Sequence, residues 1–566
     1  MYVDKQEVDE DCLYLNIFTQ FPVPKPPTPY PVVVYIHGGS WDHGSPRTFP
    51  GHMLAASQDL VVVTVAYRLG PLGESLNSSS RCPVLLPEGF DDLPINNWRC
   101  FPGFLATPGA PGNYGLLDLT AALRWVQQNI GAFNGDPGRV TVMGSEAGAA
   151  AAGLLALSPR SADLVHRVVA LSGSAVAGWA SMKDPDSMKN ASHALGEALG
   201  CSPGSRLLNC LASRSVHDLR RTLVKPRFGW LPFSPVVDNQ TRPKGEQFLP
   251  LAPQDLLDRL LPSSNFVFLS GVAANAAAEL VEADPELRRF HEYQLDEAMF
   301  TRKVKQFMEQ HNYTLNPQAT LDTITFMYRP SWYEPRHLRQ AYIDMLSDAY
   351  FKAPNDQMVK GLLRQGTRVY MYVLNYTQQG VPGPSWLGPT LSSEVLLASG
   401  APFMATHLYS ARSELVYATW TEADRNVSQL FMEAIGNLAR VGKCRELCPR
   451  NPSPQQLFNT IRWERMERTN LQYLAINGTR WEVGQEPVSR MERDYRQREA
   501  ELWQTYLPWV VARVPATWAP FLAPWAETRP LLAASIWSTG VLAVVFSVLA
   551  ISACCLFLVR RRSDSY

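Results

Sequence analysis

The chain has 566 residues, and its 52 lysines and arginines are balanced by 52 aspartates and glutamates. This balance argues against nucleic acid or any other strongly charged partner. Hydrophobic residues make up 46% of the chain, which is ample for a large packed core. We therefore expect a large folded domain that does not bind nucleic acid.

The two ends of the chain carry different targeting signals. Met1 is followed by YVDKQEVDEDC, which has neither the basic n-region nor the apolar h-region of a signal peptide. We therefore expect this start to come from an incomplete gene model or a shortened isoform. At the other end, residues 536–559 form an uncharged run of 24 residues, long enough to cross a bilayer as a helix.

The residues around this run predict how the chain is placed in the membrane. Arg560, Arg561 and Arg562 follow at once, and basic residues stay on the cytoplasmic side. We expect a type I, single-pass protein of the plasma membrane with a short cytoplasmic tail at 560–566. Residues 509–535 are rich in proline and tryptophan and should form a stalk above the membrane, and residues 1–508 should form the extracellular domain.

Between residues 31 and 376, apolar runs of strand character alternate with helical stretches. The runs occur at 32–39, 61–68, 139–144, 166–173, 265–272 and 368–376. A clear helical period appears at 116–130, and an alanine-rich helix follows the third run. This alternation predicts an α/β fold with a central, mostly parallel sheet flanked by helices.

Cysteines and glycosylation sequons both favour the secretory pathway. Cys82 and Cys100 bracket a proline-containing insertion at 70–102, whose base a disulfide between them would close. Cys444 and Cys448 lack a second ligand pair nearby, so we predict no metal site. Seven Asn-x-Ser/Thr sequons are candidate glycosylation sites, at Asn77, Asn190, Asn239, Asn312, Asn375, Asn426 and Asn477.

Several longer motifs resemble those of one known family. They are EDCLYLNIF at 10–18, HGGSWDHG at 37–44, VAYRLG at 65–70, FSPVVD at 233–238 and the long stretch at 112–144. Together they resemble the type-B carboxylesterase and cholinesterase family over residues 10–508. The resemblance implies an α/β-hydrolase fold. It also implies a disulfide between Cys201 and Cys210.

In active members of that family, a serine in G-x-S-x-G is the nucleophile, a histidine takes its proton and an acid orients the histidine. Here the elbow reads Gly-Ser-Glu-Ala-Gly, so that Glu146 stands at the nucleophile position. Aligned on the family motifs, Ala276 stands at the acid position and Leu391 at the histidine position. The residues of the oxyanion hole remain, as Gly38, Gly39 and Ala147. Because alanine and leucine transfer no proton, we predict a chain that is not an enzyme.

The inert, single-span members of this family are adhesion proteins, and the elbow and its flanks resemble those of the neuroligin branch. That resemblance implies a receptor that binds a neurexin-like protein on a neighbouring cell at the synapse. It also implies that no cofactor is needed, although calcium can lie at the contact with the partner. Two alternatives remain from the same motifs: an adhesion protein of gliotactin or neurotactin type with a different ligand, and a membrane-anchored carboxylesterase with a rearranged active site. A further alternative is a folding or trafficking module without an extracellular ligand.

The family also forms homodimers through a four-helix bundle, and we expect a homodimer here. Residues 424–441 place an apolar stripe on one helical face, which we assign to the dimer: Val427, Leu430, Phe431, Ala434 and Leu438. A second helix carries Tyr495, Leu502, Trp503 and Tyr506. The alternative is that both stripes pack on their own domain.

Overall fold

The structure is a computed structural model of the whole chain. It describes residues 12–20, 28–70, 103–107, 110–182, 185–204, 206–215, 218–219, 222, 231–259, 266–330, 334–405, 415, 417–442, 463–478 and 489–512. Residues 1–510 form one compact unit, and residues 511–566 form a second. The predicted membrane segment at 536–559, the tail, Asn77, Cys82 and Cys100 lie outside the described residues. No helix within the described residues combines the length and apolarity needed to span a bilayer.

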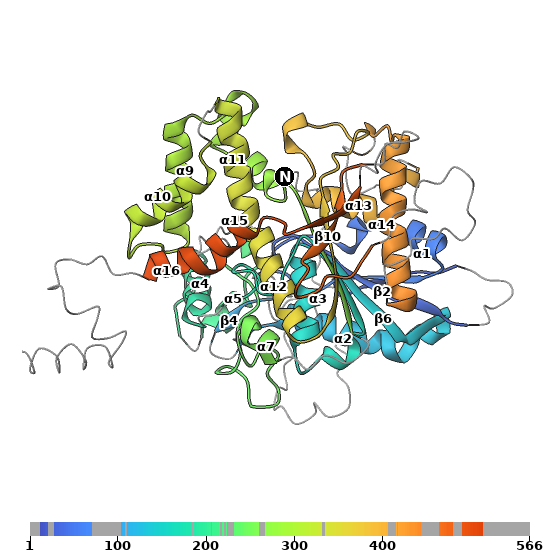
Figure 1. Ribbon diagram of the computed structural model, residues 1–566. Helices are drawn as coiled ribbons and strands as arrows, with labels where there is room; N and C mark the ends of the chain where they lie inside the picture. Colours follow the sequence, from blue (N-terminus) through green and yellow to red (C-terminus); the bar gives the residue numbers. More distant parts are fainter. Residues whose placement is uncertain are drawn as a thin grey trace, which may run out of the picture. The chain divides into compact units, whose positions relative to one another are not determined.

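A single mixed sheet of nine strands lies at the centre of the described chain (Figure 1). Its order is β1 (Leu15–Phe18), β3 (Val61–Val65), β2 (Tyr30–Ile36), β6 (Gly135–Ser145), β7 (Arg167–Leu171), β8 (Val267–Ala273), β9 (Arg368–Leu374), β10 (Gln472–Ile476) and β11 (Arg490–Arg493). The edge strands β1 and β11 pair antiparallel with their neighbours, and all the strands between them are parallel. The predicted mostly parallel sheet is therefore confirmed, with each predicted strand run on one of these strands.

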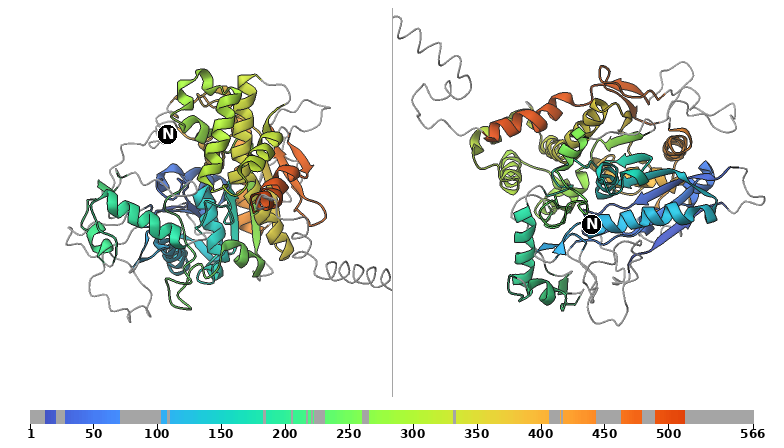
Figure 2. Two further views of the ribbon diagram at one scale, coloured as in Figure 1. Left: turned by 90° about the vertical axis from the view of Figure 1, so that its left-hand side faces the viewer. Right: turned by 90° about the horizontal axis from the view of Figure 1, so that it is seen from below.

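Helices cover both faces of the sheet, which explains why its strands are continuous apolar runs. One face packs against α1 (His52–Gln58), α13 (Leu391–Ser399) and α14 (Glu422–Val441) in the largest hydrophobic cluster. The other face packs against α2 (Tyr114–Asn129), α3 (Ala147–Leu157) and α12 (Ala353–Arg364) (Figure 2). Every residue of α3 is buried, and its alanines and glycines let the helix lie close to the strands.

The remaining described helices surround this core. They are α4 (Pro185–Ala198), α5 (Leu207–Leu211), α7 (Pro253–Arg259), α8 (Ala278–Ala283), α9 (Glu297–Gln310), α10 (Pro317–Tyr328), α11 (Pro335–Ser347), α15 (Gln497–Glu501) and α16 (Leu507–Ala512). A π-helical turn at Leu502–Tyr506 joins α15 to α16, so the first residues of the predicted stalk at 509–535 are still helical. This C-terminal helix lies beside α10, because Asn316 Nδ2 donates to the Val510 carbonyl at 3.3 Å and Trp503 Nε1 donates to the Tyr328 hydroxyl at 2.7 Å.

A disulfide joins the end of α4 to α5. The bond links Cys201 and Cys210, whose Cα atoms are 5.7 Å apart. It closes a short loop, and the Cys201 side chain is buried. The structure therefore confirms the pairing that the family resemblance implies.

A buried carboxyl group joins α13 to the middle of the sheet. The Tyr372 hydroxyl on β9 donates to Glu394 Oε1 on α13 at 2.7 Å, and Glu394 has no exposed surface. Burial raises the pKa of Glu394 from about 4.5 to about 7, although hydrogen bonds from Ser172 and Tyr372 oppose this rise. The folded chain thus holds this group more readily as a neutral acid than the unfolded chain does.

The folded chain should become less stable as the pH rises through this range. Below about pH 4.5, the neutral Glu394 makes its full contribution to the free energy of unfolding. This contribution is lost as the pH approaches 7, because the folded protein must then bury a carboxylate. The loss amounts to about 3 kcal/mol for a shift of this size. Glu394→Gln should remove this pH dependence, measured as the difference in unfolding free energy from the unchanged chain at pH 4.5 and pH 8.

Glu467→Gln, on an exposed ion pair with Arg465, serves as the control and should leave the pH dependence as it is. An equal pH dependence in the Glu394→Gln chain would contradict the assignment.

Candidate functional site

The candidate site lies where β6, β7 and β8 reach their carboxyl ends, the edge at which ligands bind in open α/β sheets. Between β6 and α3 the chain reverses at Glu146, whose φ of 53° and ψ of −115° are rarely adopted by a residue other than glycine. The turn can be this tight because glycines flank it. A Cβ on Gly144 would lie 2.2 Å from the Gly148 carbonyl carbon, and one on Gly148 would lie 2.1 Å from the Ile36 oxygen.

The Glu146 carboxylate is held by the loop that follows β2. Its Oε2 accepts from the Gly39 backbone N–H at 2.7 Å, and its Oε1 accepts from the Ser40 N–H at 3.1 Å and from the Ser40 hydroxyl at 2.8 Å. Gly38 lies directly beneath, since an added Cβ there would come within 2.9 Å of Glu146 Oε2. Of the predicted oxyanion residues, Gly39 donates to Glu146 and Gly38 makes room for it.

Ser40 was missed by the sequence reasoning, although it follows the two predicted glycines directly. Ala147 is the first residue of α3 and is fully buried. Ser145, the serine next to the nucleophile position, is turned away from this loop and lies 3.0 Å from the Tyr35 hydroxyl, oxygen to oxygen. No serine oxygen therefore occupies the place that the elbow gives to the nucleophile.

The charge on Glu146 is only partly compensated. Burial raises its pKa, although the hydrogen bonds from Ser40 and Gly39 and the nearby His43 oppose the rise. His43 contacts the Asp42 carboxylate. Burial alone would lower the pKa of His43, but Asp42 and Glu146 together raise it above the ordinary value. The site therefore brings together the carboxyl group of Asp42, the imidazole of His43 and the partly buried carboxyl group of Glu146.

The other two predicted triad positions lie on loops that meet at the same edge. Ala276 follows β8 and is fully buried, and Leu391 is the first residue of α13. The two loops are joined by hydrogen bonds from the Asn275 N–H to the Pro389 carbonyl at 3.1 Å and from Asn275 Nδ2 to the Leu387 carbonyl at 3.0 Å. Neither Ala276 nor Leu391 presents a group that can exchange a proton. Among the described residues, no cluster of three or more His, Cys, Asp or Glu side chains could hold a metal ion.

The sequons of the described chain lie mostly at the surface. Asn190, Asn239, Asn312 and Asn375 are exposed, and Asn426 and Asn477 are partly exposed. Asn375 Nδ2 donates to Asn477 Oδ1 at 2.8 Å, because the two residues follow neighbouring parallel strands, β9 and β10. Their glycosylation remains a prediction.

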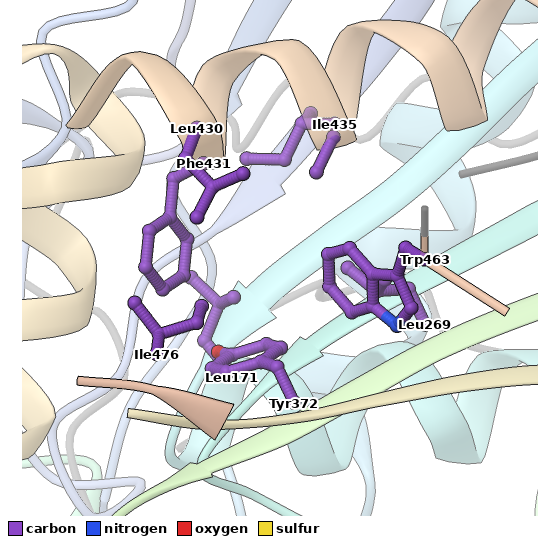
Figure 3. A pocket seen from close by; sticks show the side chains of 9 residues that line it. Leu171, Leu269, Tyr372, Leu430, Phe431, Ile435, Trp463 and Ile476 are labelled. Atoms are coloured by element: carbon purple, nitrogen blue, oxygen red, sulfur yellow. The ribbon is translucent and has the colours of Figure 1, made fainter. Parts of the chain in front are cut away.

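The residues assigned to the dimer helix are placed differently from the prediction. All five lie on the face of α14 that packs on the sheet, where Leu430 and Phe431 point toward Leu171 and Tyr372 (Figure 3). Val427, Leu430, Phe431, Ala434 and Leu438 are at most 4% exposed. Burial within the subunit leaves these side chains little surface for a subunit contact, and their assignment to the dimer stays a prediction.

Exposed apolar side chains occur instead on α10 and on the C-terminal helix. Phe326 is 89% exposed, Leu315 just before α10 is 59% exposed, and Tyr506 and Trp509 are about half exposed. Of these, only Tyr506 was singled out from the sequence. A helical stripe alone could not distinguish a face that packs on the sheet from a face that remains outside.

Comparisons with known proteins agree with the motifs. A model described as the carboxylesterase family matches residues 1–83 and 98–503. The neuroligin-like protein glit-1 of Caenorhabditis elegans is 29% identical over 559 residues, which cover 96% of this chain and 70% of that protein. Neuroligin-2 of Mus musculus is 27% identical over 542 residues, which cover 90% of this chain and 57% of that protein. The predicted resemblance to the neuroligin branch is thus confirmed, and the chain belongs to the carboxylesterase family.

Proposed function

We propose that this chain is a cell-surface adhesion protein of neuroligin type whose esterase-like domain does not hydrolyse esters. The observation that carries the proposal is the position of Glu146. Its carboxylate accepts hydrogen bonds from Gly39 and Ser40, and no serine stands at the nucleophile position of the elbow. Ala276 and Leu391 leave the other two triad positions without an acid and a base, and removal of any triad member costs several orders of magnitude in rate.

The partner and the membrane placement follow from the relatives and from the sequence. Both relatives are neuroligins or neuroligin-like by name. The proposed partner is a neurexin-like protein on a neighbouring cell, with calcium at the contact. Residues 536–559 anchor the chain as a type I protein of the plasma membrane, at the synapse if the likeness to neuroligins extends to tissue.

A homodimer formed through α10 and the C-terminal helix is also part of the proposal. The two helices lie side by side and carry large exposed apolar side chains, with Phe326 almost fully exposed. Scattered single apolar residues are ordinary on a surface, but three on two adjacent helices, with Leu315 just before one of them, favour a protein contact. In contrast, the outward side of α14 carries the sequon at Asn426, where a glycan would oppose close packing.

The chain should not react with a covalent serine-hydrolase probe. A fluorophosphonate should leave both the unchanged chain and Glu146→Ser unlabelled, because restoring the nucleophile restores neither the acid nor the base. The measurement is in-gel fluorescence after labelling, with an active carboxylesterase as the positive control. Labelling of the unchanged chain would revive the alternative of an esterase with a rearranged site.

Cells that display the chain behind an added signal peptide should bind a soluble neurexin ectodomain in calcium and release it in a chelator. The measurement is bound fluorescence per displayed receptor, with an extracellular tag reporting surface level. Absence of binding at confirmed surface levels would reject the neurexin-like partner and favour an adhesion protein of gliotactin or neurotactin type.

Phe326→Arg should weaken the dimer at least about tenfold, since a central aromatic residue commonly supplies a large share of interface energy. The measurement is the molar mass of the full chain in detergent by light scattering over a range of concentrations. Phe133→Arg, at an exposed apolar position of the turn after α2, is the matched control and should leave the mass unchanged. A dimer that survives Phe326→Arg unchanged would exclude this surface.

A further inference from the structure

The oxyanion donors of this chain already have an anionic occupant. In a serine esterase, backbone N–H groups at this place stabilise the negative oxygen of the tetrahedral intermediate. Here the Gly39 N–H, the Ser40 N–H and the Ser40 hydroxyl all donate to the Glu146 carboxylate, at 2.7, 3.1 and 2.8 Å. Both carboxylate oxygens are engaged, which makes these charge-assisted hydrogen bonds a complete small-anion cradle.

The loop that supplies the donors is held in an unfavourable backbone conformation. Gly39, Ser40 and Trp41 have consecutive φ values of 115°, 53° and 64°. Serine and tryptophan adopt positive φ only when the surrounding contacts enforce it. The contact with Glu146 fixes two of these three residues through their own N–H groups. The same loop continues to Trp41, whose carbonyl accepts the Gly70 N–H at 2.6 Å.

The charges around the cradle are mixed, and burial raises the pKa of Glu146 despite its donors. His43 lies close enough to Glu146 for each to alter the titration of the other, and it is paired with Asp42. Glu279, on α8, acts on Glu146 in the opposite sense. Glu279 is itself engaged, because its Oε1 accepts the Ser392 N–H at 3.1 Å. Three donors and one histidine thus face the carboxylate, with one more distant acid against it.

We propose that Gly39 and Ser40 form a working carboxylate-binding site whose resident ligand is the chain's own Glu146, and that a small external carboxylate occupies the site once that side chain is removed. Glu146 then acts as a positioning residue that holds the loop at 38–44 and closes the site to acyl groups from solution. The proposal concerns the ligand of the old catalytic edge and does not depend on the adhesion partner.

Four substitutions in the full chain, purified in mild detergent, test the site by acetate rescue at about pH 7.5. Glu146→Ala keeps the strained turn but empties the cradle, so its Tm should fall on the order of 5 °C. Acetate on the order of 50 mM should restore at least about half of that loss, because ligand binding to the folded state raises stability. Chloride at equal ionic strength should restore none of it.

Glu146→Gln is the sharper comparison, because it retains the side-chain volume and loses only the charge. Its Tm should fall as well, but acetate should not restore it, since the cradle has no free space. Glu433→Ala, at a buried glutamate on α14, controls for a general effect of acetate on a cavity left by truncation. Acetate should leave that variant unchanged.

Three results would overturn the proposal: an unchanged Tm in Glu146→Ala, a lowered Tm in Glu146→Ala that acetate does not raise, or a gain in acetate that Glu146→Gln and Glu433→Ala share. If Glu146→Ala does not fold in chloride, the readout becomes the yield of folded protein after refolding in acetate against chloride. Equal yields would reject the site. In the Glu146→Ala chain, a second change, Ser40→Ala, removes one hydroxyl donor and should weaken the acetate effect.

Discussion

The fold around the site depends on the close approach of α3 to the ends of β2 and β6. The helix can lie there only because Gly144 and Gly148 carry no side chain, since a Cβ on either would meet backbone atoms at little more than 2 Å. The approach forces the chain to reverse at a single residue with positive φ. Whatever residue stands at that position must project toward the loop after β2. In this chain the residue is Glu146, and the consequences follow from its carboxylate.

The carboxylate at the elbow gives the donor groups of the loop after β2 a new acceptor, while the loop keeps its place beside the elbow. A hydrolase keeps these donors free for a reaction intermediate. Here they donate to the side chain of Glu146. The strained loop residues gain a partner within the chain, because Glu146 accepts from Gly39 and Ser40. The geometry of the hydrolase edge thus persists because the same contacts stabilise the fold. Retained glycines at this place are therefore no sign of retained chemistry.

The sequence predicted the sheet well, because strands buried on both faces are continuous runs of apolar, β-branched residues. Motif register alone predicted a residue for each triad position, and these assignments stay predictions. The contact between Glu146 and Ser40 could not, because the two residues are 106 positions apart and meet only through the pairing of β2 with β6. The apolar stripe of α14 shows a second limit of sequence reasoning. An apolar stripe reports that a helix face is buried, and it does not report whether the sheet or a second subunit buries it.

The exposed aromatic residues of α10 and the C-terminal helix lie on elements separate from those that form the old catalytic edge. Glu146 lies at the turn between β6 and α3 and its donors lie in the loop after β2, whereas Phe326 and Trp509 lie on helices that contribute no residue to the cradle. Because Glu146 occupies the donors, no substrate has to reach them from solution. The surface around the site therefore does not have to keep an entrance open. Recognition can then develop on any exposed surface that the rigid sheet supports. Under the proposed function, the esterase fold serves as a stable scaffold, and the contacts of Glu146 contribute rigidity to it.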